Sequence, residues 1–266
     1  NSDRVVPIEE CWLPHPEIAR LWPLLNVADQ GNLERVAFRV GDPGEVMIIL
    51  VGPNKPDIEM EINFPASVVW IEDQGYSVLA GDSAIQITIL NRTFHVSGGS
   101  FFQVHSDLTS DLVTLVMDAL DLKPDQTVLD LYAGVGLFSA FVSEIGARVI
   151  AVEQSAWAAK DFVFNLDEFN SVELYEAAVE IVLPSLRIQP DRILIDPPRA
   201  GLGPDVTEEI IRLSPTRLVY VSCDPTTLAR DGKTLMEGGY TLKSVLPIDL
   251  FPQTFHIETI SIWQKR

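Results

Sequence analysis

Short apolar runs that alternate with helix-compatible stretches constrain the fold of the second part of this chain more than any other feature. From about Asp107 onward, helical stretches at about 137–145, 155–169 and 205–213 separate four runs with the character of buried strands: Thr127–Leu131, Arg148–Val152, Arg192–Asp196 and Leu218–Ser222. Such alternation implies right-handed crossovers and a parallel sheet with helices on both faces. We therefore predict a doubly wound α/β domain. A preceding helix, Leu108–Leu120 capped by Ser106, and an antiparallel edge hairpin of Tyr240–Val245 and His256–Trp263 complete it.

The first 105 residues have a different, strand-rich pattern. A helix is expected from about Pro16 to Leu25, and Gly, Asp or Asn residues separate four predicted strands: Val46–Val51, Ser67–Ile71, Tyr76–Leu79 and Ile85–Leu90. We predict two domains, a smaller strand-rich domain over residues 1–105 and a catalytic domain over residues 106–266.

Composition excludes several classes of protein. The 266 residues are 47% hydrophobic and 21% charged, a balance that suits a globular chain with a continuous core. No run approaches the roughly 18 apolar residues of a membrane span, and no secretory leader is visible. Two cysteines, Cys11 and Cys223, cannot build a disulfide framework, so we expect a cytoplasmic, reducing setting and no membrane partner.

The net charge of −19 bears on nucleic-acid binding. Residues 1–105 carry 6 basic and 14 acidic side chains, and the remainder carries 13 and 24. Neither part resembles a protein that binds nucleic acid by broad neutralisation of phosphates. A nucleic-acid substrate would therefore need a local positive surface or another segment of protein.

Two features at the carboxyl ends of the predicted strands suit an adenosine-containing cofactor. Gly134 and Gly136 follow the first strand and let the backbone approach a ligand closely, although Ser139 breaks the dinucleotide fingerprint. Glu153 ends the next strand, 19 residues after Gly134, where its carboxylate can accept hydrogen bonds from ribose hydroxyls. NAD and S-adenosylmethionine both fit, and a tight structural turn with a solvated Glu remains the alternative.

The third strand ends in Asp196-Pro-Pro-Arg199. The two prolines stiffen the loop and end the ladder of hydrogen bonds, which would hold Asp196 against a ligand in the cleft. Methyltransferases that act on planar nitrogens or bases often carry such a loop, whereas dehydrogenases do not need one. Arg199 would meet a phosphate or pair with an acidic neighbour.

Candidate catalytic groups follow the fourth strand and the final hairpin. Cys223 would lie at the same edge as Asp196, and a helix capped by Asp224 would stabilise its thiolate as a nucleophile. His256 and Glu258 are two residues apart, so in a strand they share a side, and one of them can serve as a general base. Taken singly, each is more often a core cysteine, a hydrogen-bonded histidine or a surface glutamate.

Together these residues resemble the RNA (uracil-5-)-methyltransferase family. Five motifs occur in the family's order and span nearly the whole chain: Ser100-Phe-Phe-Gln-Val-His105, Asp130-Leu-Tyr-Ala-Gly-Val-Gly136, Asp196-Pro-Pro-Arg-Ala-Gly201, Ser222-Cys-Asp-Pro-Thr-Thr-Leu-Ala-Arg-Asp231 and Phe251-Pro-Gln-Thr-Phe-His-Ile-Glu258. The resemblance implies a class I methyltransferase (Rossmann-like) sheet, S-adenosylmethionine as cofactor, and tRNA or rRNA as substrate. A monomer and no bound metal are expected.

The resemblance also implies roles for individual residues. Cys223 matches the nucleophile that adds to C6 of uracil, and Glu258 matches the base that removes the C5 proton. The cofactor-binding positions are Gln103, Tyr132, Gly134, Glu153 and Asp196. Phe101, Arg199 and His256 are the candidate contacts to the RNA, whose target uridine must leave its stack.

Departures from the family pattern keep other functions open. Leu137 and Ala178 stand where members often carry polar or acidic residues, which would weaken cofactor contacts. Many members begin with an OB-like RNA-binding domain, which we expect upstream of residue 1. Some hold a four-cysteine iron–sulfur cluster, which makes Cys11 either an orphaned ligand or a core residue. The rivals are a non-catalytic RNA-binding relative and an NAD-dependent oxidoreductase.

Overall fold

The computed structural model describes residues 7–28, 33–53, 59–72 and 75–266, and the chain divides into two compact units. The first unit comprises residues 1–88 and 97–99, and the second comprises residues 89–96 and 100–266. Strands β7 (Ala84–Ile89) and β8 (Arg92–Ser97) form a two-stranded sheet within which the chain passes from one unit to the other. The functional boundary at residue 105 stays a prediction.

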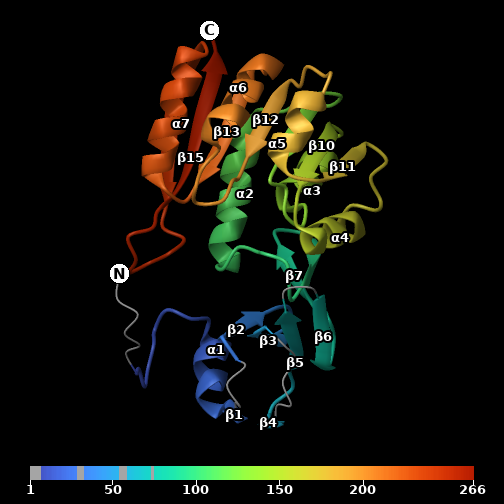
Figure 1. The fold of residues 1–266 in the computed structure, drawn as a ribbon, viewed down its shortest axis with the longest axis vertical. Helices are drawn as coiled ribbons and strands as arrows, with labels where there is room; N and C mark the ends of the chain where they lie inside the picture. Colours follow the sequence, from blue (N-terminus) through green and yellow to red (C-terminus); the bar gives the residue numbers. More distant parts are fainter. Residues whose placement is uncertain (1–6, 29–32, 54–58, 73–74) are drawn as a thin grey trace. The chain divides into compact units, whose positions relative to one another are not determined.

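The first unit is built on a four-stranded sheet. Its strands, in the order β2-β3-β5-β6, are Arg35–Val40, Val46–Val51, Ser67–Glu72 and Gly75–Ala80 (Figure 1). Ile48, Leu50, Val68 and Trp70 form its buried core. A second pair, β1 (Asn26–Ala28) and β4 (Glu59–Glu61), is antiparallel. The predicted strands over residues 46–90 are confirmed, but β2 and β8 were not predicted, because Arg35, Arg39, Arg92 and His95 interrupt their apolar pattern.

The helix predicted from Pro16 to Leu25 is shorter in the structure. Helix α1 covers Pro16–Leu21, and a 3-10 turn, η1, follows over Trp22–Leu24. Pro23 explains the change, because a proline disfavours helical geometry in the residue before it and lacks the N–H that a helix interior needs.

The second unit contains the predicted doubly wound sheet. Its seven strands lie in the order β11-β10-β9-β12-β13-β15-β14: Val172–Glu176, Arg148–Glu153, Thr127–Leu131, Arg192–Ile195, Arg217–Ser222, Glu258–Lys265 and Tyr240–Ile248. The first five are parallel, and β15 and β14 add the predicted antiparallel hairpin. The prediction of a class I methyltransferase sheet with a smaller strand-rich part before it is confirmed.

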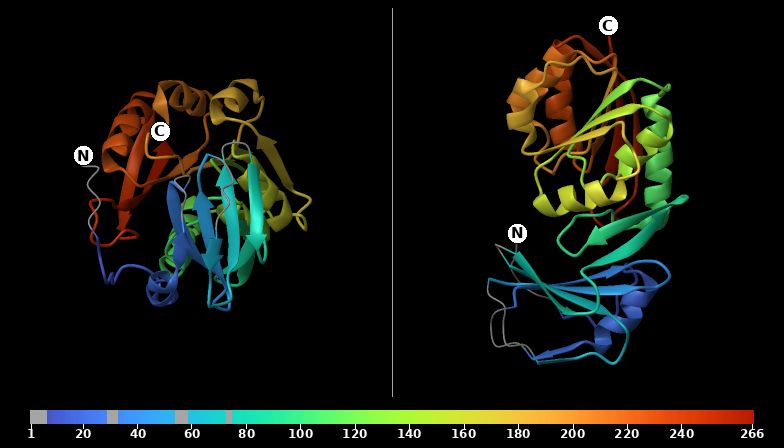
Figure 2. Two further views of the ribbon diagram at one scale, coloured as in Figure 1. Left: turned by 60° about the horizontal axis from the view of Figure 1, so that its bottom comes forward. Right: turned by 90° about the vertical axis from the view of Figure 1, so that its right-hand side faces the viewer.

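Helices cover both faces of this sheet, as the right-hand view of Figure 2 shows. One face carries α2 (Ser106–Leu120), α3 (Leu137–Glu144) and α4 (Ala156–Asn165), and the other carries α5 (Val179–Val182), the 3-10 turn η2 (Leu183–Ser185), α6 (Gly203–Leu213) and α7 (Pro225–Glu237). Within the described ranges, none of the helices combines the length and apolar character that crossing a bilayer requires.

Three local features differ from the sequence prediction. Helix α2 begins at Ser106, and its N-cap is His105, whose Nδ1 accepts a hydrogen bond from the Leu108 amide in place of the predicted Ser106 cap. Strand β11 was missed because Val172-Glu-Leu-Tyr-Glu176 is half polar, as an edge strand can be. Strand β15 begins at Glu258, which leaves His256 in the preceding loop.

Candidate functional site

The predicted motifs meet at the carboxyl edge of the second unit's sheet. The chain leaves β9 to build β10 and β11 on one side, then returns to place β12 on the other side of β9. This reversal is the switch point at which open α/β sheets bind ligands. Glu153 ends β10, and the loops after β9, β12 and β13 carry Gly134, Asp196 and Cys223, so the topology brings the candidate residues to one edge.

The loop after β9 has the backbone geometry of a ligand-binding turn. Tyr132, Gly134 and Gly136 all have positive φ angles, of 63°, 56° and 89°. A Cβ atom built on Gly134 would meet nothing within 4 Å, whereas one on Gly136 would lie 2.3 Å from Leu166 Cδ1. Gly134 therefore leaves open space above the loop, and Gly136 permits close packing of helix α4. The positive φ of Tyr132 is the kind of backbone strain that concentrates at functional sites.

Glu153 holds this loop from the neighbouring strand. Its carboxylate accepts hydrogen bonds from the Gly134 amide at 2.8 Å and from the Ser155 amide at 2.7 Å. A carboxylate has about four lone-pair sites, so each oxygen retains the capacity to accept a hydroxyl hydrogen bond. The buried side chain is thus suited both to fix the loop and to bind ribose hydroxyls.

Asp130 lies beneath the loop, fully within the protein. Ser139 Oγ donates a 2.6 Å hydrogen bond to its Oδ2, while Oδ1 has no partner in the described part of the chain. Burial is the main cause that raises the pKa of Asp130 to about 7, and nearby Glu153 adds to it. An orphaned buried acceptor under an open glycine loop indicates a site that expects a polar ligand or water.

Asp196 and Gln103 meet across the crevice. The Asp196 amide donates to the Leu131 carbonyl at 3.3 Å, and Gln103 Nε2 donates to Asp196 Oδ2 at 3.5 Å. Burial, followed by the charges of Glu258 and Asp130, raises the pKa of Asp196 well above its ordinary value. The protonated form of Asp196, which can donate a hydrogen bond to a ligand, is therefore favoured relative to that of an exposed aspartate.

Asp231 anchors the Asp196 loop, a role that the sequence reasoning missed. This buried carboxylate of α7 accepts hydrogen bonds from the Leu202 amide at 2.9 Å and from the Tyr220 hydroxyl at 2.9 Å. Arg230 Nε donates to its other oxygen at 2.9 Å, and Arg230 Nη2 donates to the Ala200 carbonyl at 2.8 Å. The only signal in the sequence was an Arg-Asp pair at the end of the Ser222–Asp231 motif.

The pairing of β13 with β15 places Cys223 opposite Glu258. The last registered pair of the two antiparallel strands is Ser222 with Thr259, and Thr259 Oγ1 donates to the Ser222 carbonyl at 3.0 Å. Cys223 and Glu258 each lie one residue beyond this last pair, and they are close enough for Glu258 to act electrostatically on the Cys223 thiol. Asp224 caps α7 as predicted, accepting from the Thr226 amide at 2.8 Å and the Thr227 amide at 3.3 Å.

Burial governs the protonation of this pair. It raises the pKa of Glu258 to about 7. It also raises the pKa of the Cys223 thiol; Glu258 acts in the same direction, whereas the cationic Arg199 lowers it. The sequence prediction that the helix N-terminus stabilises a thiolate is not met, because desolvation and the nearby carboxyl outweigh it. Cys223 is therefore a thiol at neutral pH until a partner removes its proton.

The structure gives each of the three candidate RNA contacts a defined position. Arg199 is exposed and acts electrostatically on Cys223. Phe101 is 67% exposed, two residues before Gln103. His256 lies in the loop before β15, so the prediction that it shares a strand face with Glu258 is wrong, but it is close enough to Asp224 to influence that carboxyl.

The two departures from the family pattern also have defined positions. Leu137 is buried at the start of α3. Ala178 is the N-cap of α5 and provides no side-chain hydrogen bond to it. Their effect on cofactor affinity stays a prediction.

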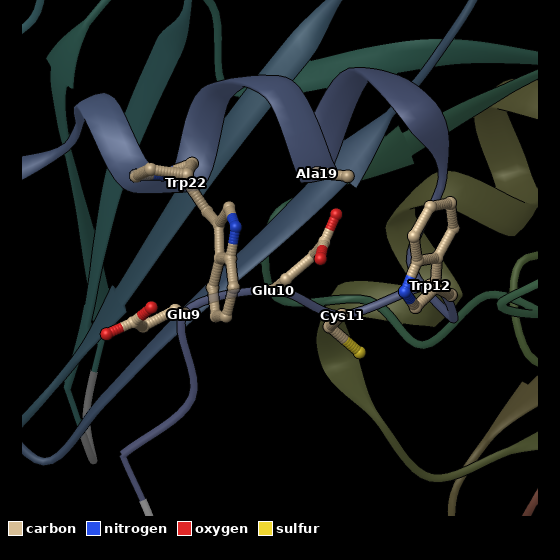
Figure 3. A pocket seen from close by; sticks show the side chains of 7 residues that line it. Glu9, Glu10, Cys11, Trp12, Ala19 and Trp22 are labelled. Atoms are coloured by element: carbon tan, nitrogen blue, oxygen red, sulfur yellow. The ribbon is translucent and has the colours of Figure 1, made fainter.

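A separate pocket lies in the first unit, away from these residues in the sequence. It has a volume of about 500 Å³, and Figure 3 shows the segment from Glu9 to Trp12 running alongside helix α1; its lining is Glu9, Glu10, Cys11, Trp12, Ala19, Trp22 and Pro23. Cys11 is partly exposed there, which argues against a core role. In residues 7–28, 33–53, 59–72 and 75–266, no three His, Cys, Asp or Glu side chains cluster as metal ligands would.

The fold and the switch-point loops define a class I methyltransferase-type domain. A family model described as tRNA (Uracil-5-)-methyltransferase matches residues 167–266. An uncharacterised RNA methyltransferase of Streptococcus mutans is 31% identical over 302 residues, which cover 100% of this chain and 67% of the relative. The chain therefore belongs to the RNA (uracil-5-)-methyltransferase family.

Two further comparisons bear on the site. An uncharacterised RNA methyltransferase of Thermotoga maritima is 44% identical over 186 residues, 69% of this chain and 42% of the relative. The crystal structure of the Pyrococcus abyssi tRNA (uracil-54, C5)-methyltransferase in complex with S-adenosyl-L-homocysteine superposes with a TM-score of 0.72 at 26% identity, covering 88% of this chain and 60% of that one. The chain thus spans less than two thirds of the length of both proteins.

Proposed function

We propose that this chain transfers a methyl group from S-adenosylmethionine to C5 of a uridine in RNA. The observation that carries the proposal is the position of Cys223 and Glu258 at the switch-point edge, each one residue beyond the last registered pair of β13 and β15, where the charges of Glu258 and Asp196 both act on the Cys223 thiol. A cysteine opposite a carboxyl group of pKa about 7 supplies a nucleophile and a base within one site. The Pyrococcus abyssi relative, whose substrate is uracil-54 of tRNA, supports uridine as the target.

The residues at the edge fit the cofactor. The open space above Gly134, the remaining acceptor capacity of Glu153 and the orphaned Asp130 oxygen are the features that an adenosine with a charged tail needs. Gln103, Tyr132, Gly134, Glu153 and Asp196 would hold it. When bound, S-adenosylmethionine supplies an electrophilic methyl group on a sulfonium.

The reaction at the uracil follows from the two catalytic side chains. Cys223 first releases its thiol proton to the solvent. The thiolate then forms a bond to C6, and the electron pair of the C5=C6 double bond moves to make C5 nucleophilic. C5 then accepts the methyl group. The Glu258 carboxylate removes the C5 proton, the double bond forms again, and the bond between C6 and the sulfur of Cys223 breaks. Cys223 leaves as a thiolate, so the enzyme is regenerated apart from the proton on Glu258.

The test is covalent trapping on RNA that contains 5-fluorouridine, with S-adenosylmethionine present. Fluorine cannot leave as a proton, so a protein–RNA adduct that survives denaturation should accumulate. The chain offers a matched control, because it has two cysteines. Cys223→Ser should abolish the adduct and Cys11→Ser should retain it. Sequencing the attached RNA would distinguish tRNA from rRNA and identify the uridine.

Two results would contradict the proposal. An adduct that persists in Cys223→Ser would exclude Cys223 as the nucleophile. A chain that forms no adduct and does not bind the cofactor would favour the non-catalytic RNA-binding relative, for which the buried Leu137 and the apolar Ala178 are the sequence signals.

A further inference from the structure

The loop between β14 and β15 presents three aromatic rings in series beside the candidate catalytic pair. Phe255 and His256 have ring centroids 4.1 Å apart, and His256 and Phe251 have centroids 6.0 Å apart in an edge-to-face arrangement. Phe255 is at the outer end of the series and is 90% exposed. The same loop leads directly into Glu258, three residues after Phe255.

Hydrogen bonds within the loop define the conformation that holds these rings. The Thr254 amide and Thr254 Oγ1 both donate to the Phe251 carbonyl, at 3.1 and 2.8 Å, and the His256 amide donates to Thr254 Oγ1 at 3.1 Å. Leu250, at the start of the loop, is buried. These hydrogen bonds fix the turn so that the Phe255 ring stays exposed to solvent, with the imidazole of His256 packed against one side of it.

The aromatic loop is linked to both candidate catalytic residues. His256 acts electrostatically on Asp224, the residue after Cys223, while the peptide chain connects the loop to Glu258. Because the apolar surface of Phe255 stays in contact with water, this side chain adds no hydrophobic stabilisation to the folded chain. A flat apolar surface at this place suits a ligand with an exposed π-face.

The charge of the chain favours stacking over phosphate contacts as the source of RNA affinity. With a net charge of −19, the chain has little capacity for broad neutralisation of phosphates. Proteins that bind single-stranded nucleic acid gain about 1–3 kcal/mol for each base stacked on an aromatic side chain. We propose that Phe255, supported by His256, stacks on an unpaired nucleobase next to the target uridine in single-stranded RNA. This inference rests on the proposed function and adds a substrate-binding residue to it.

The second unit contains a matched control. Phe164 on α4 is 62% exposed and also lies against a histidine, with 4.5 Å between the centroids of Phe164 and His95. Helix α4 packs on β10 and β11, and three strands, β9, β12 and β13, separate β10 from β15. Neighbouring strands lie about 4.8 Å apart, so Phe164 and Phe255 belong to elements at opposite sides of the sheet.

The experiment compares the whole chain with Phe255→Ala, Phe255→Trp and Phe164→Ala. Total RNA substituted with 5-fluorouridine is titrated in the presence of S-adenosylmethionine, and the rate of adduct formation is measured at each RNA concentration. Phe255→Ala should raise the half-saturating RNA concentration about 5- to 150-fold, while Phe255→Trp stays within a few fold of wild type. Phe164→Ala should match wild type, and all four proteins should bind S-adenosylhomocysteine equally.

A second measurement identifies the stacked base. The RNA recovered from the adduct is remade with an abasic nucleotide at either neighbour of the modified uridine. At one of the two positions, loss of the base should weaken wild type to the level of Phe255→Ala and leave that variant unchanged.

The outcomes separate the two proposals. Equal half-saturation of wild type and Phe255→Ala, or a difference that neither abasic RNA removes, would overturn the role of Phe255 and leave the methyltransferase function intact. A wild-type chain that forms no adduct would overturn the proposed function and the stacking role with it.

Discussion

At the scale of single residues, Asp130, Asp196 and Glu258 share the carboxyl edge of the sheet, and burial raises the pKa of each. Ionisable groups with displaced pKa values cluster at functional sites, because the chemistry needs a proton to be gained or lost near neutral pH. Here one carboxyl lies beneath the glycine loop, one beside Gln103 and one opposite Cys223. Under the proposed function, Asp130 and Asp196 would lie on the ligand-binding side of the site, and Glu258 would remove the proton.

The pH dependence of methyl transfer should report Glu258 and Cys223. Glu258 must be ionised to accept the C5 proton, so turnover on uridine RNA should rise as the pH passes through about 7. It should continue to rise above that, because the pKa of the Cys223 thiol lies above its ordinary value. Initial rates between pH 6 and 9 with a saturating cofactor measure this profile.

Glu258→Gln provides the decisive variant for this profile. It should lower turnover about 10²- to 10⁴-fold and remove the inflection near pH 7. Because addition of Cys223 does not need the C5 proton to leave, the variant should also accumulate a Cys223-linked adduct on ordinary uridine RNA. A flat profile in the wild type, or full turnover by Glu258→Gln, would exclude Glu258 as the base.

Asp130 should make the stability of the chain depend on pH. Its pKa is about 7 in the folded protein against an ordinary value of 3.8, so the folded state binds the proton more tightly. This contribution is complete below about pH 4 and is lost as the pH rises through 7. Between pH 5 and 8 the loss is on the order of 2–3 kcal/mol. Asp130→Asn, which cannot ionise, should gain that amount relative to wild type in urea unfolding, and an unchanged difference between the two pH values would contradict it.

At the scale of secondary-structure elements, the sequence predicts the strands that are continuous apolar runs and the helix start that has a capping side chain. The apolar runs ending in Glu153, Asp196 and Cys223 become β10, β12 and β13, and parallel pairing brings their ends together as expected. The cap at Asp224 also follows from local chemistry.

What the sequence does not predict depends on contacts distant along the chain. The half-polar β11 becomes a strand only because β10 offers it an edge. His105, rather than the predicted Ser106, is the N-cap of α2, because His105 has the extended backbone conformation of an N-cap residue. Asp231 gains its role from Leu202 and Tyr220, 29 and 11 residues away in the sequence. The hydrophobic pattern around a residue does not indicate partners that lie far away along the chain.

Asp231 should hold the Asp196 loop in place. Asp231→Asn keeps the size of the side chain but replaces one carboxylate oxygen with a donor, either the oxygen that accepts from the Leu202 amide and the Tyr220 hydroxyl or the one that accepts from Arg230. Leaving one buried donor unsatisfied costs about 1–3 kcal/mol, which urea unfolding measures. Cofactor affinity should fall as well, because Asp196 loses its fixed loop. Asp118→Asn, at an exposed position of α2, is the control and should change neither quantity; equal stability of the two variants would exclude the anchoring role.

At the scale of the whole molecule, the negative charge is spread over the chain. Residues 1–105 contribute −8 and residues 106–266 contribute −11, so neither part compensates for the other. Under the proposed function, RNA approaches against the mean field of this chain, and we expect local contacts at Arg199 and the aromatic loop to supply the attraction that this chain itself provides.

The salt dependence of RNA capture should consequently have the opposite sign to that of a basic RNA-binding protein. A basic surface releases counterions on binding, and its affinity falls steeply with salt. In this chain, raising the ionic strength from about 0.01 to 0.15 M shortens the Debye length from about 30 to about 8 Å and screens the repulsion between RNA and protein. The rate of adduct formation on 5-fluorouridine RNA, at subsaturating RNA, should rise over this range, and the melting temperature should rise with it because internal repulsion is screened too. An adduct rate that falls tenfold or more with added potassium chloride would instead show that cationic contacts to phosphates dominate the encounter.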